Sequence, residues 1–161
     1  MKRVLLLATL LLSSLPAAAV APGKGSFGIA GTFSSGFPGS GVQFTPGLSG
    51  TVWATDQLQL GADLVFGSQE NAGTRLGLNG RVSFYPVKTD DFGAFVTGAL
   101  GFANYSPPVG DGTTQVALQL GGGAEYFMNR HFGVALIEGL NLHTKPTTFN
   151  LDTELRLSVY F

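Results

Sequence analysis

The sequence has no cysteine and unusually little charge. Without cysteine the chain cannot form a disulfide, a cysteine-containing metal site or a cysteine-linked lipid anchor. Charged residues make up 12% of the chain, against about 25% in an ordinary soluble domain. A soluble protein with so few charges would struggle to cover its exterior, whereas a protein that faces lipid has no such need.

The first nineteen residues are typical of a cleavable secretory signal peptide. Lys2 and Arg3 precede the apolar run Val4–Leu12, and Ala17–Ala19 supplies small residues for cleavage. The run is shorter than the roughly 20 residues of a transmembrane helix, which disfavours the alternative of an uncleaved anchor. We therefore expect a signal peptide over residues 1–19 and a single domain over residues 20–161.

Charge balance and glycine distribution exclude several classes of ligand. Without Lys2 and Arg3 the chain keeps seven basic and ten acidic residues, which argues against a nucleic-acid partner. The clusters Gly98–Gly101 and Gly121–Gly123 are followed by no helix, so neither is a phosphate-binding loop. Acidic pairs such as Asp90 and Asp91 lack the spacing of a calcium loop. We expect no cofactor and no metal.

Apolar residues alternate with period two in eight segments of about ten residues, the length of a membrane-spanning strand. The apolar positions begin and end at Phe27 and Phe33, Val42 and Val52, Leu58 and Phe66, Leu76 and Phe84, Phe92 and Phe102, Val116 and Tyr126, Phe132 and Leu142, and Leu151 and Phe161. Turn-forming residues separate the segments. The pattern predicts an all-β fold: an eight-stranded antiparallel up-and-down transmembrane β-barrel.

Alternation alone does not say which face points outward, because a soluble lipocalin-like carrier has eight similar strands with its apolar face inward. The polar face holds few charges of mixed sign, which suits a narrow lumen better than a solvated exterior. Buried ions need partners, so we predict one lumen ionic network, comprising Asp63, Arg81, Glu125, Glu154 and Arg156. The lipocalin-like carrier remains the alternative.

Aromatic residues close three of the segments that run in the same direction, each just before a turn. The residues are Trp53, Phe84, Tyr85, Tyr126 and Phe127, and the last segment ends similarly in Tyr160 and Phe161. Aromatic rings concentrate where a membrane meets water. The pattern predicts an aromatic girdle at one membrane interface.

The C-terminal stretch Leu155–Phe161 and the strand–turn–strand segment Ala124–Val134 resemble the small outer-membrane barrels of the OmpA, OmpX and OmpW type. The resemblance implies an outer-membrane location and a membrane-insertion signal formed by Leu155, Leu157, Val159, Tyr160 and Phe161. It also implies three kinds of partner, namely outer-membrane lipid, the machinery that inserts barrels, and periplasmic chaperones.

Eight strands enclose a lumen that side chains can fill, so we expect no open pore. A structural or surface-interaction role follows as the leading interpretation. A lipid-modifying enzyme is the less favoured alternative, because only His131 and His143 are available as bases and Ser106 is the one nucleophile to consider.

One residue conflicts with the pattern. Glu138 is in phase with the apolar face, where an acidic side chain is unfavourable. We predict that a β-bulge near Gly139 turns Glu138 inward.

Overall fold

The structure is a computed structural model that describes residues 20–36, 43–69, 73–107, 109–144 and 147–161. The predicted signal peptide, residues 1–19, lies outside the described residues. The described part contains eight strands: β1 Phe27–Gly36, β2 Gln43–Trp53, β3 Leu58–Gln69, β4 Gly73–Lys88, β5 Phe92–Ser106, β6 Thr113–Asn129, β7 Phe132–Thr144 and β8 Thr147–Tyr160. In the same residues, no helix is long and apolar enough to cross a membrane.

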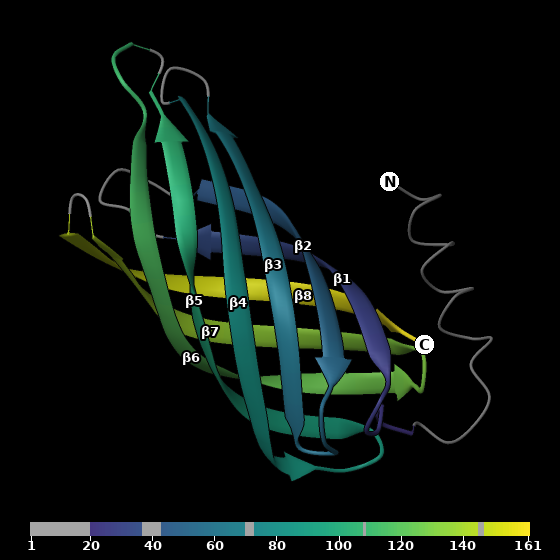
Figure 1. Cartoon of the computed structure of the whole chain (residues 1–161). Helices are drawn as coiled ribbons and strands as arrows, with labels where there is room; N and C mark the ends of the chain where they lie inside the picture. Colours follow the sequence, from purple (N-terminus) through teal and green to yellow (C-terminus); the bar gives the residue numbers. More distant parts are fainter. Residues whose placement is uncertain (1–19, 37–42, 70–72, 108, 145–146) are drawn as a thin grey trace, which may run out of the picture.

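The strands form one closed antiparallel barrel (Figure 1). Each strand pairs with the next in the sequence, and β1 closes the sheet by pairing with β8 in the register Gly28↔Tyr160 to Gly36↔Asp152. Closure gives hydrogen-bond partners to the backbone N–H and C=O groups at the edges of the first and last strands, as a membrane-embedded sheet requires. The predicted fold class is confirmed.

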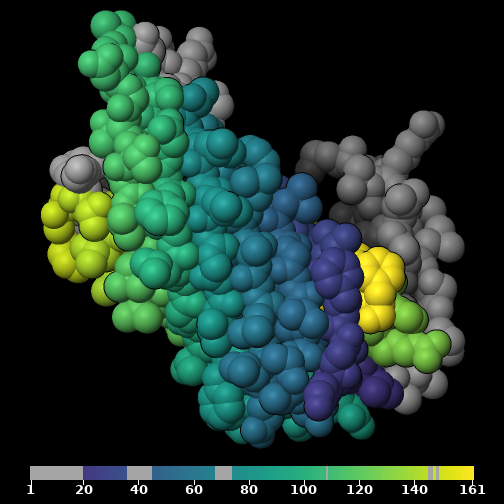
Figure 2. Space-filling model, in the orientation of Figure 1, coloured from purple at the N-terminus to yellow at the C-terminus, as the bar shows by residue number. Residues whose placement is uncertain are grey.

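The apolar positions of every strand face outward. Leu78, Leu100 and Phe102 are each 60% exposed or more, whereas the alternate positions on the same strands are mostly buried. In Figure 2 the strands that face the viewer form a continuous wall of side chains. A lipocalin-like carrier has the opposite polarity, so that alternative interpretation is wrong.

The two ends of the barrel differ in length and shape. The short connections at residues 54–57, 89–91 and 130–131 lie at the end that carries Phe161, which we call the turn end. The opposite end, which we call the loop end, is uneven because β4, β5 and β6 are the longest strands, with 15 to 17 residues each. Figures 1 and 2 show the β5–β6 hairpin projecting beyond the rest of the barrel.

The prediction of a bulge near Gly139 is wrong. The β6–β7 ladder continues without interruption through Gly122↔Glu138 and Gly121↔Gly139, and Glu138 is exposed on the outward face. The register shifts lie elsewhere, between Phe84 and Val87 and between Phe127 and Asn129, close to turns. A side chain that alternation places outward therefore stays outward, and its carboxylate accepts a hydrogen bond from the Thr153 hydroxyl at 2.9 Å.

Candidate functional site

An aromatic cluster fills the lumen at the turn end. Its rings belong to Trp53, Tyr85, Phe95, Phe127 and Tyr160, each at most 3% exposed. Trp53 and Tyr85 have ring centroids 4.7 Å apart, and Tyr85 and Phe95 are 4.8 Å apart. These are distances at which aromatic pairs attract each other beyond the burial of their area. We call this cluster the aromatic floor.

The predicted aromatic girdle is wrong for three of its five residues. Trp53, Tyr85 and Phe127 point into the barrel, so their assignment to a membrane interface is wrong. Phe84 and Tyr126 face outward, with 45% and 54% of their surface exposed. The physical reason is the strand period of two, which sends adjacent side chains to opposite faces. Only one member of each adjacent aromatic pair can face lipid.

Glu125 is hydrogen-bonded to the aromatic floor. Its two carboxylate oxygens accept hydrogen bonds from the hydroxyls of Tyr85 at 2.7 Å and Tyr160 at 2.6 Å. Glycine provides the room for these groups. A Cβ at Gly93 would lie 2.8 Å from the Tyr85 ring, and a Cβ at Gly133 would lie 2.6 Å from the Glu125 carboxylate. A side chain at either position would have to displace the Tyr85 ring or the Glu125 carboxylate.

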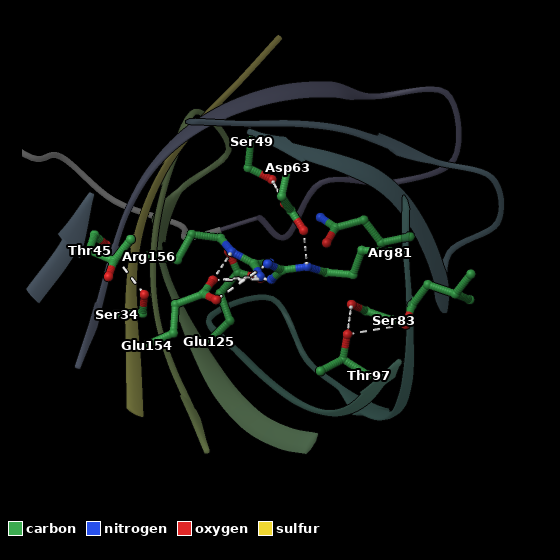
Figure 3. Close-up of polar contacts among 12 residues, drawn as sticks. Ser34, Thr45, Ser49, Asp63, Arg81, Ser83, Thr97, Glu125, Glu154 and Arg156 are labelled. Atoms are coloured by element: carbon green, nitrogen blue, oxygen red, sulfur yellow. Dashed lines mark hydrogen bonds and ion pairs between the residues drawn. The ribbon is translucent and has the colours of Figure 1, made fainter. Parts of the chain in front are cut away.

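An ionic layer crosses the lumen next to the floor. Arg81 on β4 donates from Nε to Asp63 at 2.7 Å and from Nη1 to Glu154 on β8 at 3.1 Å. Arg156 donates from Nη2 to the same Glu154 oxygen at 3.0 Å, and the Ser49 hydroxyl donates to Asp63 at 2.5 Å. Figure 3 shows Arg81 reaching across the lumen towards Glu154 and Arg156. All four charged side chains are nearly inaccessible to solvent.

The structure brings together four of the five residues that were expected to form the lumen network. Glu125 is the exception. It faces the lumen, but its hydrogen-bond partners are tyrosines, and no ion pair joins it to a described arginine or lysine. The sequence analysis missed Tyr85 and Tyr160 as these partners. Each tyrosine lies out of phase with the apolar positions of its own strand, as Glu125 does on β6, and this was the signal that could have identified them.

The segment before β1 covers the aromatic floor from the turn end. Ala21 packs against the floor, and the amide of Gly25 donates to the Trp53 carbonyl at 2.8 Å. The Lys88 ammonium lies 3.5 Å from the centre of the Trp53 ring and donates to the Pro22 carbonyl. A cation over an aromatic face is attracted by the ring, so Lys88 joins this segment to the floor.

Polar side chains occupy the lumen between the ionic layer and the loop end. Nη2 of Arg75 lies 3.3 Å from Nε2 of His143, and Asn141 donates a hydrogen bond to Asp152. We call Arg75, Asn141, His143 and Asp152 the loop-end cluster.

The structure separates the residues considered for catalysis. The Ser106 hydroxyl donates to Asn104 at 3.2 Å, and His143 is hydrogen-bonded to Arg75. His131 lies at the turn end, where its Nδ1 is 3.0 Å from the Tyr160 carbonyl oxygen. Neither histidine is hydrogen-bonded to a serine in the described part of the chain, and nucleophilic catalysis depends on such a contact.

The residues of the expected insertion signal lie on both faces of β8. Leu155 and Leu157 are outward and about half exposed, Tyr160 belongs to the aromatic floor, and Phe161 is 70% exposed at the turn end. Val159 is in phase with the leucines. These positions are ordinary strand alternation and do not by themselves reveal a recognition signal.

Comparison with known proteins identifies the fold through structure alone. No protein-family model matches the chain, and no curated protein matches it. The N-terminal β-barrel domain of Pseudomonas aeruginosa OprF has a TM-score of 0.68 and 15% identity over 86% of this chain and 99% of that one. Neisserial surface protein A has a TM-score of 0.63 and 11% identity, with coverages of 84% and 94%.

A third similar structure is Ail, the attachment invasion locus protein of Yersinia pestis. Its TM-score is 0.53 and its identity 11%, over 86% of this chain and 98% of that one. The three solved structures span nearly the same length as this chain. At these identities the likeness shows the fold.

Proposed function

We propose that this chain, which has the fold of the small eight-stranded outer-membrane β-barrels, is an integral protein of a bacterial outer membrane with a structural or surface-interaction role. The outward face supports membrane insertion, because large apolar side chains such as Leu78 and Leu120 are more than half exposed on it. Burial of that face in lipid is favourable at about 25 cal/mol per Å² of apolar surface.

The observation that carries the role is the double obstruction of the lumen. The aromatic floor closes the turn end, and the Asp63–Arg81–Glu154–Arg156 layer crosses the lumen beside it. A barrel blocked in two places does not conduct as an open pore. What it offers to its surroundings is a rigid wall and the projecting β5–β6 hairpin.

The direction of insertion follows from the resemblance to outer-membrane barrels, in which short turns face the periplasm and longer loops face outward. We therefore place the loop end outside the cell. Two of the similar structures are named for a surface protein and for attachment and invasion, and contact with the exterior is the kind of role that we propose here. The chemistry of the site offers no support for an enzymatic role.

Fractionation and electrophysiology test the proposal. The protein should appear in the outer-membrane fraction, resist detergent, and migrate differently on a gel when it is not heated. In planar lipid bilayers the refolded protein should give no stepwise conductance above the lipid background. Recovery in the soluble fraction would refute the membrane assignment, and stable channels would refute the closed lumen.

A further inference from the structure

Glu138 is a charged residue on the surface that faces lipid. It points outward from β7 between Leu136 and Leu140, which are 53% and 48% exposed. Leu142, the last outward apolar residue of β7 towards the loop end, is about 13 Å farther along the strand. Phe132, at the turn end of the same strand, is farther still. Lipid headgroups and water therefore lie away from the carboxylate at both ends.

Glu138 also lacks a cationic partner. Among the described outward positions within the apolar band, no other carries a charged residue, and the ion pairs of the described residues do not include Glu138. The Thr153 hydroxyl lies 2.9 and 3.0 Å from its two carboxylate oxygens. A carboxylate has about four acceptor positions, so one hydroxyl donor leaves most of its hydrogen-bonding capacity unused.

The surface beside Glu138 is low. The residue paired with it on β6 is Gly122, and the next outward residue of β6 towards the turn end is Ala124. On β8 it is paired with Thr153. Small side chains let two membrane-embedded chains approach closely, so that polar groups on them can meet. We call Gly122, Ala124, Glu138 and Thr153 the Glu138 patch.

We propose that the Glu138 patch is the contact surface between two copies of this chain. Ionisable side chains within a membrane almost always face a protein interior or pair with one another. Two barrels inserted in the same direction carry Glu138 at the same depth, and a two-fold axis along the membrane normal sets a residue against its own copy. The inference rests on the membrane insertion proposed above.

The chemistry of the contact is a hydrogen-bonded pair of Glu138 carboxyl groups. Two carboxylates at close range repel each other, whereas one proton taken from water and held between them forms a short O–H···O bond. Such a pair needs no cation, and the described outward face of a second copy offers none. Glutamine at this position can make the same contact without a proton, and leucine cannot make it.

Energy transfer between labelled barrels measures the association. Because the chain has no cysteine, Asp90→Cys in the exposed β4–β5 turn carries one dye on each barrel. Donor-labelled and acceptor-labelled proteins are refolded together into phosphatidylcholine vesicles, starting at protein-to-lipid ratios low enough for monomers. We expect saturable transfer above that of randomly distributed barrels. Glu138→Leu should weaken the association about fivefold or more, and Glu138→Gln should retain it.

Two further substitutions locate the contact on the barrel. Ala124→Phe places a ring over the low part of the Glu138 patch and should weaken the association as Glu138→Leu does. Leu78→Phe adds a ring at an exposed position of β4, three strands away from β7 around the barrel, and should leave the association unchanged. The heat-dependent gel shift establishes that each variant is folded.

Flotation with the vesicles separates this inference from the membrane assignment. Protein that does not float would refute the membrane assignment and the dimer with it. A folded, floating barrel whose energy transfer stays at the random level would overturn the dimer alone. Equal association of the parent, Glu138→Leu and Ala124→Phe would also overturn the inference, because the contact would then lie on another part of the barrel.

Discussion

Arg81 is the residue through which most of the buried charge of the barrel is connected. It contacts Asp63 at 2.7 Å and Glu154 at 3.1 Å, so the variant Arg81→Met leaves two buried carboxylates without their shared cation. Removing one member of a buried ion pair costs about 3–5 kcal/mol. We expect a loss of that size in the free energy of unfolding, measured by urea titration of the refolded barrel in micelles.

Arg156→Met is the matched control for this prediction. Glu154 keeps its ion pair with Arg81 in that variant, so the loss should be clearly smaller. Equal losses in the free energy of unfolding for the two variants would show that Arg81 contributes no more to stability than Arg156.

Glu138 leads to a prediction of the opposite sign. It is exposed in the middle of β7 between the outward-facing Leu136 and Leu140. A basic residue at the bilayer midplane costs about 2–4 kcal/mol and an acidic one less. The variant Glu138→Leu should therefore raise the free energy of unfolding in lipid vesicles by about 1 kcal/mol.

Thr153 supplies the control, because its hydroxyl is the hydrogen-bond donor to Glu138. Thr153→Val should destabilise the wild type and have little effect in the Glu138→Leu background, which a double-mutant cycle measures. If Glu138→Leu instead lowered stability in native membranes but not in vesicles, a membrane partner of Glu138 would be indicated.

At the scale of elements, alternation predicts the strands and their faces because a strand places successive side chains on opposite sides. The same rule, applied strictly, also separates Trp53 from Val52 and Tyr85 from Phe84. The predicted girdle was wrong for Trp53, Tyr85 and Phe127 because the ends of the strands were treated as one feature and the face of each residue was not considered separately. The inward bulge at Gly139 was wrong because glycine permits a register shift without requiring one.

Contacts across the lumen lie beyond what alternation predicts. The pairing of Glu154 with both Arg81 and Arg156, and of Glu125 with two tyrosines, depends on strand tilt and on which rings fill the floor. A periodic pattern identifies the inward face, but the stagger between β4 and β8 decides which inward residues meet.

The pairing of β8 with β1 is the element that closes the barrel, and Phe161 extends it. The backbones of Phe161 and Phe27 exchange hydrogen bonds of 2.8 and 3.2 Å, and their rings are stacked at 6.4 Å. Full burial of a Phe is worth about 1.5–3 kcal/mol, and Phe161 is mostly exposed. Deleting Phe161 should therefore lower the amount inserted in cells, measured by fractionation, and leave the refolded barrel nearly as heat-resistant as the wild type.

Phe27→Ala removes the same ring contact without changing the C-terminal residue. This control variant should insert in normal amounts. Normal insertion of the Phe161 deletion would show that Leu155–Phe161 is strand alternation only and that no insertion signal resides there.

At the scale of the whole molecule, the segment 21–25 at the turn end bears on processing. Ala21 packs on the aromatic floor, and the Pro22 carbonyl accepts a hydrogen bond from the Lys88 ammonium. Cleavage after Ala19 leaves Val20 as the first residue, just outside these contacts. N-terminal sequencing of the membrane-fraction protein should therefore begin at Val20, and retention of residues 1–19 in that fraction would contradict the prediction.

The two obstructions of the lumen make a combined prediction about conduction. Trp53→Ala with Tyr85→Ala opens the aromatic floor but leaves the Arg81–Glu154–Arg156 ion pairs in place. Arg81→Ser with Glu154→Ser removes that layer and leaves the floor. Because either barrier alone still fills the narrow lumen, each double variant should remain at the lipid background in planar bilayers.

Only the quadruple variant, which lacks both barriers, should conduct. Its fold is checked first by far-UV circular dichroism and by the heat-dependent gel shift, because it loses buried contacts at two levels. Tyr85→Phe keeps the ring but removes the hydrogen bond to Glu125. This variant should conduct no more than the wild type, because the ring itself fills the space. Conductance in either double variant would mean that the barrel is closed at one level and that the other level is already permeable to ions.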